Sequence, residues 1–85
     1  MITAEDRRAS LEFKRRLMEI VPVLDLRIFG SRARGKASPD SDLDIFVEVA
    51  ELTPSLRRQI DEIAWEVGFE LGYIISPVVA TRKQL

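Results

Sequence analysis

The sequence predicts a small α/β (α+β) domain in which helices pack on one face of a small mixed β-sheet. Two long stretches in which apolar residues recur every three or four positions indicate amphipathic helices. Three shorter runs rich in apolar and β-branched residues indicate strands. Strands joined by helices favour a sheet covered by those helices. With 85 residues, we expect one domain, residues 1–85, near the lower size limit for independent folding.

The first helix is expected over residues 4–21. Thr3 is a suitable N-cap, and Pro22 cannot continue a helix, so it marks the end. One side of this helix carries large apolar residues, namely Phe13, Leu17, Ile20 and Val21. Its basic residues are interspersed with acidic ones, which indicates a solvated helix face rather than a nucleic-acid-binding surface.

Three further elements follow from local signals. Residues 23–29 are expected to form the first strand, and residues 45–49 read as a second strand. Thr53-Pro54 is a helix start in which threonine caps and proline occupies the first helical position. This second helix is expected to end near Gly72, because glycine commonly terminates helices.

The last strand is expected over residues 73–80. Pro77 lies within it and places it at a sheet edge or a bulge, because proline cannot donate to a strand ladder. Trp65 flanks the apolar stripe of the second helix and is interpreted as core or interface packing rather than as a base-stacking platform.

Composition excludes several classes of chemistry. The chain has 13 basic and 14 acidic residues and a net charge of -1, which argues against a general nucleic-acid or membrane binder. It has no cysteine and no histidine, which rules out disulfides, thiolate metal sites and imidazole bases. We find no apolar stretch of the ~20 residues that span a membrane and no signal-peptide core. These features predict a cytoplasmic protein.

A pair of aspartates stands at the head of the second strand. Asp42 and Asp44 are two positions apart, so on a strand both side chains project from the same face, roughly 6.6 Å apart along the chain. Two carboxylates that close repel each other unless a cation lies between them. Mg²⁺ is commonly held by one or two carboxylates together with waters and substrate phosphates. Asp42 and Asp44 are therefore the candidate metal ligands.

A complementary basic segment precedes the aspartates. Gly30 lets the backbone approach a ligand closely, and a short helix starting after Gly30-Ser31, through about residue 36, would offer N–H groups to an anion. Arg32 and Arg34 add positive charge, and residues 27–36 contain no acid. Phosphate-binding cations beside metal-binding carboxylates are what a magnesium nucleotide requires. Gly30, Ser31, Arg32 and Arg34 are therefore the candidate nucleotide-binding residues.

An EF-hand calcium loop is a competing interpretation of the acidic spacing. Acidic residues occupy positions 1, 3, 5 and 12 of such a loop if it starts at Asp40. However, position 6 is Ile45, where the sharp turn of the loop requires glycine. The residues that follow read as a strand, whereas a calcium loop connects two helices. We reject this interpretation.

Gly30-Ser31, followed after ten residues by Asp42-Leu43-Asp44, resembles the signature of the nucleotidyltransferases related to DNA polymerase β. The Gly-Ser-Arg-Ala-Arg-Gly start and the short chain are similar to the minimal nucleotidyltransferases. The resemblance implies a polymerase β palm-like fold, with Asp42 and Asp44 as catalytic residues and ligands of one or two Mg²⁺ ions. It also implies transfer of a nucleoside monophosphate, AMP from ATP, to a hydroxyl acceptor.

The same resemblance implies a protein partner, a HEPN-domain toxin, with this chain as antitoxin of a toxin–antitoxin pair. The chain offers no room for an acceptor-binding domain, so the acceptor is expected to arrive on that partner. Because so small a domain buries only a small core, self-association or assembly into a hetero-oligomer is also expected as a way to bury more surface.

The resemblance is incomplete at one point, because fully equipped members of the superfamily carry a third carboxylate on the strand after the long helix. Residues 73–80 contain no acid. Glu48 and Glu70 are poorly placed substitutes, and Ser76 could at most hold a water molecule. Two alternatives therefore stay open: an antitoxin-type binding module that acts by contact alone, and the catalytic half of a small-molecule nucleotidyltransferase.

Overall fold

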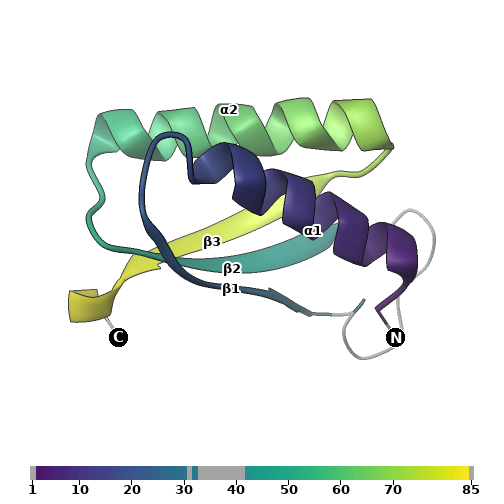
Figure 1. Ribbon diagram of the computed structural model, residues 1–85, viewed down its shortest axis with the longest axis horizontal. Coiled ribbons are helices and arrows are strands. Elements are labelled where there is room, and N and C mark those ends of the chain that lie inside the picture. The colour runs from purple at the N-terminus through teal and green to yellow at the C-terminus, as the bar shows by residue number, and fades with distance from the viewer. Residues whose placement is uncertain (1, 31, 33–41, 85) are drawn as a thin grey trace.

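The computed structural model describes residues 2–30, 32 and 42–84 (Figure 1). In chain order the elements are α1 (Ala4–Leu17), β1 (Val23–Phe29), β2 (Leu43–Val49), α2 (Pro54–Leu71), β3 (Ile75–Thr81) and the 3₁₀ helix η1 (Arg82–Gln84). The sheet order is β1-β2-β3, with β1 antiparallel and β3 parallel to the central strand β2.

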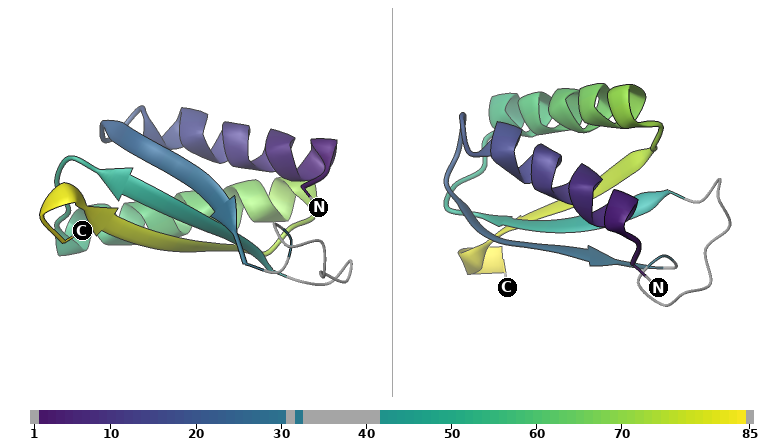
Figure 2. Two further views of the ribbon diagram at one scale, coloured as in Figure 1. Left: turned by 90° about the horizontal axis from the view of Figure 1, so that it is seen from below. Right: turned by 45° about the vertical axis from the view of Figure 1, so that its right-hand side comes forward.

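Both helices cover the same face of this mixed sheet. In Figure 1 α1 and α2 lie above the strands, and the view from below in Figure 2 shows the strands in front of both helices. The other face carries no helix among the described residues. The predicted fold class, a small mixed sheet with helices on one face, is confirmed.

The core lies between the helices and β2. Alternate residues of β2, from Leu43 to Val49, are completely buried, which is the period expected of a strand with one covered face. Helix α1 contributes Phe13 and Leu17 to the same core, and α2 contributes Ile60 and Val67. The intervening residues of β2 therefore face the open side of the sheet.

Helix α1 begins as expected and ends earlier than expected. The Thr3 hydroxyl accepts a hydrogen bond from the Asp6 amide at 3.0 Å, which confirms the predicted cap. The prediction that the helix continues to residue 21 is wrong, because α1 ends at Leu17. Pro22 disfavours helical geometry in the residue before it, and the chain tightens so that the Ile20 amide donates to the Leu17 carbonyl at 2.9 Å.

Helix α2 matches its predicted limits. Thr53 caps it, Pro54 is its first residue and Gly72 ends it in the left-handed conformation, at φ 80°. The last strand is also at the sheet edge, as Pro77 predicts, but it begins at Ile75 rather than at residue 73. The Tyr73 amide instead donates to the Gly68 carbonyl at 2.8 Å, so the chain turns back on the helix before the strand starts.

Gly68 permits this turn. An added Cβ at position 68 would lie 2.5 Å from the Tyr73 carbonyl oxygen, closer than a real Cβ can approach. The glycine within the helix therefore has a packing reason, although it costs about 1 kcal/mol relative to alanine.

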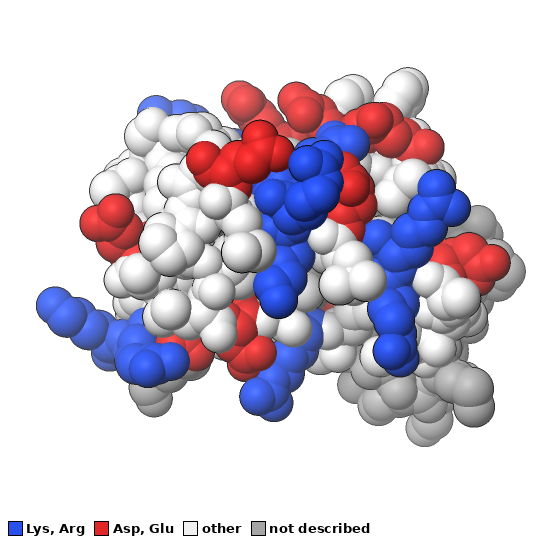
Figure 3. All heavy atoms as spheres, in the orientation of Figure 1, with Lys and Arg blue, Asp and Glu red and all other residues white. Residues whose placement is uncertain are grey.

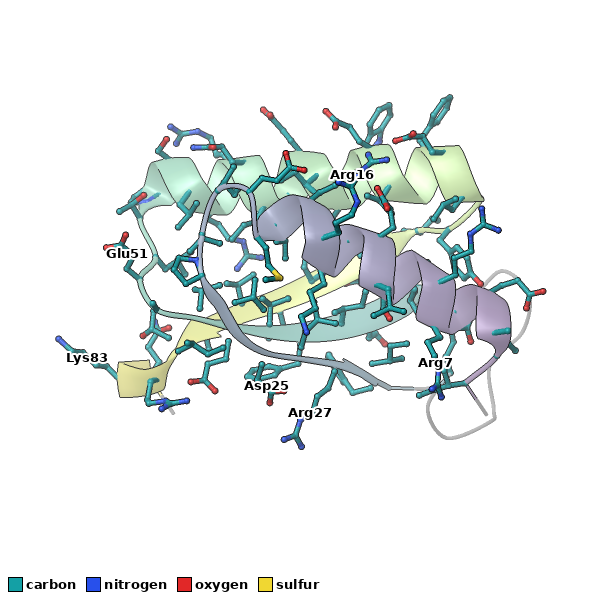
Figure 4. All side chains as sticks on the ribbon, in the orientation of Figure 1. Arg7, Arg16, Asp25, Arg27, Glu51 and Lys83 are labelled. Carbon is teal, nitrogen blue, oxygen red and sulfur yellow. The ribbon has the colours of Figure 1, made fainter. Side chains whose placement is uncertain are left out.

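The basic residues of α1 are paired with acids. Arg15 and Arg16 both bind Glu12, and Arg16 also reaches Glu70 on α2 at 2.6 Å. Figure 3 shows basic and acidic side chains side by side on this face, and Figure 4 shows Arg16 between the two helices. The interpretation of this surface as a solvated helix face agrees with these ion pairs.

Trp65 is not part of the core. It is 68% exposed and its ring stacks on Phe69, with centroids 5.4 Å apart. The prediction that Trp65 packs in the core is wrong, because Ala64 and Val67 occupy the buried side of α2 instead. A groove of about 530 Å³ lies beside it, between α2 and the start of β3. None of the described helices is long and apolar enough to cross a membrane.

Candidate active site

Asp44 lies on the open face of the sheet, at the head of the central strand. Its neighbours Leu43 and Ile45 are fully buried beneath the helices, whereas Asp44 is partly exposed. Side-chain direction alternates along a strand, so the Asp44 carboxylate projects away from the helices. Asp42 is exposed and stands one position before β2, so a direction shared with Asp44 stays a prediction from strand alternation.

Gly30 packs directly against Asp44. It follows the last residue of β1, Phe29, which pairs with Asp44 across the sheet. Gly30 has a φ of 79°, a conformation that glycine adopts without steric cost. An added Cβ at position 30 would overlap Oδ2 of Asp44 and lie 3.1 Å from its Cγ. The structure therefore brings the glycine and the second aspartate of the predicted signature together.

Ser76 stands beside Asp44 on the other flank. In the parallel pairing of β2 with β3, Asp44 is opposite Ser76, so the two side chains share the open face. The strand position from which a third carboxylate would reach this site is thus held by a hydroxyl. Glu48 and Glu70 do not replace it, because they form ion pairs with Arg82 at 2.8 Å and with Arg16 at 2.6 Å.

Arg32 contacts protein groups on two sides. Its guanidinium donates to Oδ1 of Asp6 at 3.0 Å and lies 5.1 Å from the ring centroid of Tyr73. The side chain of Arg32 is only 12% exposed. The predicted phosphate ligand therefore has its charge placed on a carboxylate of α1, although its role toward a nucleotide stays a prediction.

Asp6 is the acceptor at the centre of this cluster. It is buried and also accepts from the Tyr73 hydroxyl at 2.8 Å and from the Thr3 amide at 3.1 Å. Burial raises the pKa of Asp6, but the bonds from Tyr73 and Thr3 and the charge of Arg32 together bring it below its usual value. Burial and the bond to Asp6 raise the pKa of Tyr73, which keeps its hydroxyl a donor at neutral pH.

Sequence reasoning did not find this cluster. The sequence patterns single out neither Asp6, in the first turn of the expected helix, nor Tyr73, in the expected last strand. The one local signal is the spacing Thr3-x-x-Asp6, which is a capping box and accounts for Asp6 without a partner from elsewhere. Arg32 is 26 residues away from Asp6 in the chain, so no spacing rule connects them.

Two predicted site residues, Ser31 and Arg34, lie outside the described residues. The same holds for most of the short helix expected after Gly30.

The remaining donors fit a magnesium nucleotide. Among the described residues, no group of three or more acidic side chains gathers as a metal site. Mg²⁺ does not require one, because it is often held by one or two carboxylates and completed by waters and substrate phosphates. Asp44 has no ion pair with any described residue, and because Gly30 carries no side chain, the Asp44 carboxylate can lie against the backbone where a Cβ would otherwise stand.

A mixed sheet covered by helices on one face, with a glycine turn packed on an aspartate of its central strand, is the architecture of the nucleotidyltransferase fold. The chain belongs to the nucleotidyltransferase domain family, whose sequence model matches residues 11–84.

A relative of this chain carries a more specific name. The protein adenylyltransferase MntA of Thermococcus cleftensis is 40% identical to this chain over 62 residues. The match covers 72% of this chain and 62% of that protein, so the chain spans less than two thirds of the relative. No solved structure matches the chain.

Proposed function

We propose that this protein transfers AMP from ATP to a hydroxyl group of a protein partner, in a Mg²⁺-dependent reaction in the cytoplasm. The observation that carries the proposal is the close approach of the Gly30 backbone to the Asp44 carboxylate. A glycine turn of the kind that binds phosphate thus lies beside a carboxylate of the kind that binds a metal ion. Membership of the nucleotidyltransferase family and the adenylyltransferase name of the relative support it.

Each residue has a distinct part in this reaction. The backbone at Gly30 and the segment that follows would bind the triphosphate, and Asp42 and Asp44 would hold one or two Mg²⁺ ions. Bound Mg²⁺ would neutralise the triphosphate and lower the pKa of the acceptor hydroxyl. The acceptor oxygen forms a bond to the α-phosphorus, the bond from that phosphorus to the bridging oxygen breaks, and pyrophosphate leaves. The hydroxyl proton passes to water.

The partner is proposed to be a HEPN-domain toxin, with this protein as its antitoxin. The resemblance of residues 30–44 to the minimal nucleotidyltransferases supports this pairing. Modification of a hydroxyl side chain on the toxin would then be the means of neutralisation.

A binding module without catalysis is the second candidate. The observation that favours it is the serine at position 76, where a third carboxylate would complete the site, together with the pairing of Glu48 and Glu70 elsewhere. In that case the protein would neutralise its partner by contact alone.

An isotope experiment separates the two candidates. The protein is incubated with Mg²⁺, a candidate HEPN-domain partner and ATP labelled at either the α- or the γ-phosphate. We expect label on the partner from α-labelled ATP only, because pyrophosphate carries away the γ-phosphate. Neutralisation of the partner with no label on it would instead establish the binding module.

A matched pair of variants assigns the role of the aspartates. Asp42→Asn combined with Asp44→Asn should abolish Mg²⁺-dependent ATP binding in calorimetric titration while the protein stays folded. Asp25→Asn removes an acid from the same sheet face, where Asp25 binds Arg27 at 2.9 Å (Figure 4), and should leave ATP affinity unchanged. Equal ATP affinity in the double variant, with and without Mg²⁺, would remove both aspartates from the metal site.

A further inference from the structure

Three segments that surround the candidate active site meet at one cluster, centred on the buried Asp6. Asp6 comes from the first turn of α1, Arg32 from the segment after β1, and Tyr73 from the connection between α2 and β3. In Figure 1 the N-terminal end of α1 lies near the end of the sheet where β1 ends and β2 begins. The cluster is therefore at the same end of the sheet as Gly30 and Asp44.

Two members of the cluster, Arg32 and Tyr73, lie close in the chain to residues that contact the site. Arg32 is two positions after Gly30, whose backbone packs on Asp44. Tyr73 precedes Ile74, whose carbonyl accepts from the Leu43 amide at 2.8 Å, directly before Asp44. Movement of Arg32 would thus displace Gly30, and movement of Tyr73 would displace the backbone that pairs with Leu43, so either one would alter the surroundings of the Asp44 carboxylate.

The contacts hold Arg32 firmly. A charge-assisted hydrogen bond to a carboxylate is roughly twice as strong as a neutral one, and the Tyr73 ring adds a cation–π contact. Asp6 has its own two further donors, Tyr73 and Thr3, so its orientation is set before Arg32 is counted.

We propose that Asp6 and Tyr73 are positioning residues of the active site, which act through Arg32 to keep the Gly30 turn packed against Asp44. The inference rests on the proposed nucleotide-binding function of that site. It differs from the expectation that Arg32 binds phosphate directly, because here the guanidinium is used to fix the backbone from within the protein.

The two roles of Arg32 predict opposite effects of one substitution. Asp6→Asn keeps an oxygen that can accept from the Thr3 amide but removes the charge that holds Arg32. If Asp6 positions the turn through Arg32, the substitution weakens Mg²⁺-ATP binding. If Asp6 merely competes with phosphate for Arg32, the substitution removes that competition and tightens binding.

Calorimetric titration with Mg²⁺ and a non-hydrolysable ATP analogue tests the proposal. We expect Asp6→Asn and Tyr73→Phe each to weaken binding by about 10- to 100-fold, the usual loss when an outer-shell partner of a site is removed. Thr53→Ala is the matched control, since it removes the cap hydroxyl of α2, which accepts from the Leu56 amide at 3.1 Å, far from Arg32. Its affinity should stay within about twofold of the parent.

A double-mutant cycle separates action through Arg32 from a general loss of structure. If Asp6 acts through Arg32, then Asp6→Asn combined with Arg32→Ala should bind no more weakly than Arg32→Ala alone. Arg32→Lys, which keeps the charge near Asp6, should retain more affinity than Arg32→Ala.

The outcomes are distinguishable from a failure of the proposed function. No binding by the parent would defeat the nucleotide site itself. Binding by the parent with unchanged or tighter binding in both Asp6→Asn and Tyr73→Phe would overturn the positioning role. Additive losses in the cycle would also overturn it. Tyr73→Phe keeps the ring that packs on Arg32, so the test remains available if Asp6→Asn does not fold.

Discussion

Asp44 and Glu48 occupy the same face of the same strand, four residues apart, and differ in everything that surrounds them. Glu48 is only 7% exposed and binds Arg82 at 2.8 Å. Asp44 is partly exposed and lies between a glycine and a serine, with no ion pair to any described residue. The chain therefore supplies a cation, Arg82, for Glu48 at one end of the open face, and the described residues supply none for Asp44 at the other end.

The difference shows how to separate a structural acid from a candidate ligand on one strand. A buried carboxylate is costly unless it is paired, so Glu48 requires Arg82 whatever the protein does. A partly exposed carboxylate flanked by small residues gains nothing from its neighbours and is available to a cation from outside. The following predictions change one end at a time and ask whether the effect is on binding or on stability.

The largest effect is expected from Gly30→Ala. The new Cβ would require a strained backbone at φ 79° and would overlap the Asp44 carboxylate, so Mg²⁺-ATP binding should fall below detection by calorimetry. Gly72→Ala is the matched control, because Gly72 has nearly the same φ, 80°, and no atom within 4 Å of an added Cβ. It should cost about 1–3 kcal/mol of stability and leave ATP affinity unchanged. Equal losses of ATP binding in both variants would show that backbone strain alone, rather than the contact with Asp44, causes the loss.

A gain of activity is expected from Ser76→Asp. Ser76 faces the same side as Asp44, so an acid there would stand where the site lacks its third carboxylate. A general base or added metal ligand is typically worth about 10²–10⁴-fold, so we expect at least a tenfold faster transfer of label from α-labelled ATP.

The other end of the same strand supplies the control for this gain. Ala80 is opposite Glu48, as Ser76 is opposite Asp44. Ala80→Asp should destabilise the protein through repulsion from Glu48 and leave the transfer rate unchanged. If neither the parent nor Ser76→Asp transfers label to any partner, the enzyme hypothesis fails and the binding module stands.

Arg82→Met should affect stability alone. It leaves the buried Glu48 without its cation. An unsatisfied buried polar group costs about 1–3 kcal/mol and a charged one more; because Arg82 is largely exposed and solvent screens the pair, we expect a loss of about 1–3 kcal/mol. Arg27→Met breaks the more exposed pair with Asp25 and should cost less than about 1 kcal/mol. Urea unfolding measures both losses. A change of ATP affinity in Arg82→Met would contradict the view that the Glu48 end of the strand serves stability alone.

The sequence predicted the elements and the pairing of the signature better than it predicted the cluster behind them. Caps, proline positions and period-2 alternation are local, so Thr53, Gly72 and the buried face of β2 followed from short-range rules. The meeting of Gly30 with Asp44 also followed, because a glycine turn after one strand and an acid at the head of the next define a pattern.

What escaped prediction depends on contacts between distant segments. Nothing near Arg32 shows that its charge lies on Asp6, and nothing near Gly68 shows that Tyr73 folds back onto it. For Trp65, which residue type predicts to lie in the core or an interface, the core alternative is wrong because α2 turns this side chain outward, and the interface alternative stays a prediction. Such outcomes are decided by tertiary packing, which a residue's own neighbourhood does not encode.

The smallest predicted effect is a change of stability with pH, and it concerns a further acid, Asp6, which is buried like Glu48 but linked to the candidate site through Arg32. The pKa of Asp6 in the folded protein lies below its usual value of 3.8. A lowered pKa means that its contribution to stability is present above pH ~4 and is lost as the pH falls through the folded pKa. Asp6→Asn should therefore be less stable than the parent at pH 7, and this difference should shrink as the pH falls below ~4. Other acids, including Glu12, whose pKa the hydrogen bonds from Arg15 and Arg16 lower to about 2, titrate in both proteins and cancel in the comparison. Urea unfolding of both proteins at each pH gives the difference directly, and a gap that stays constant across the range would show that the Asp6 charge adds nothing to the cluster.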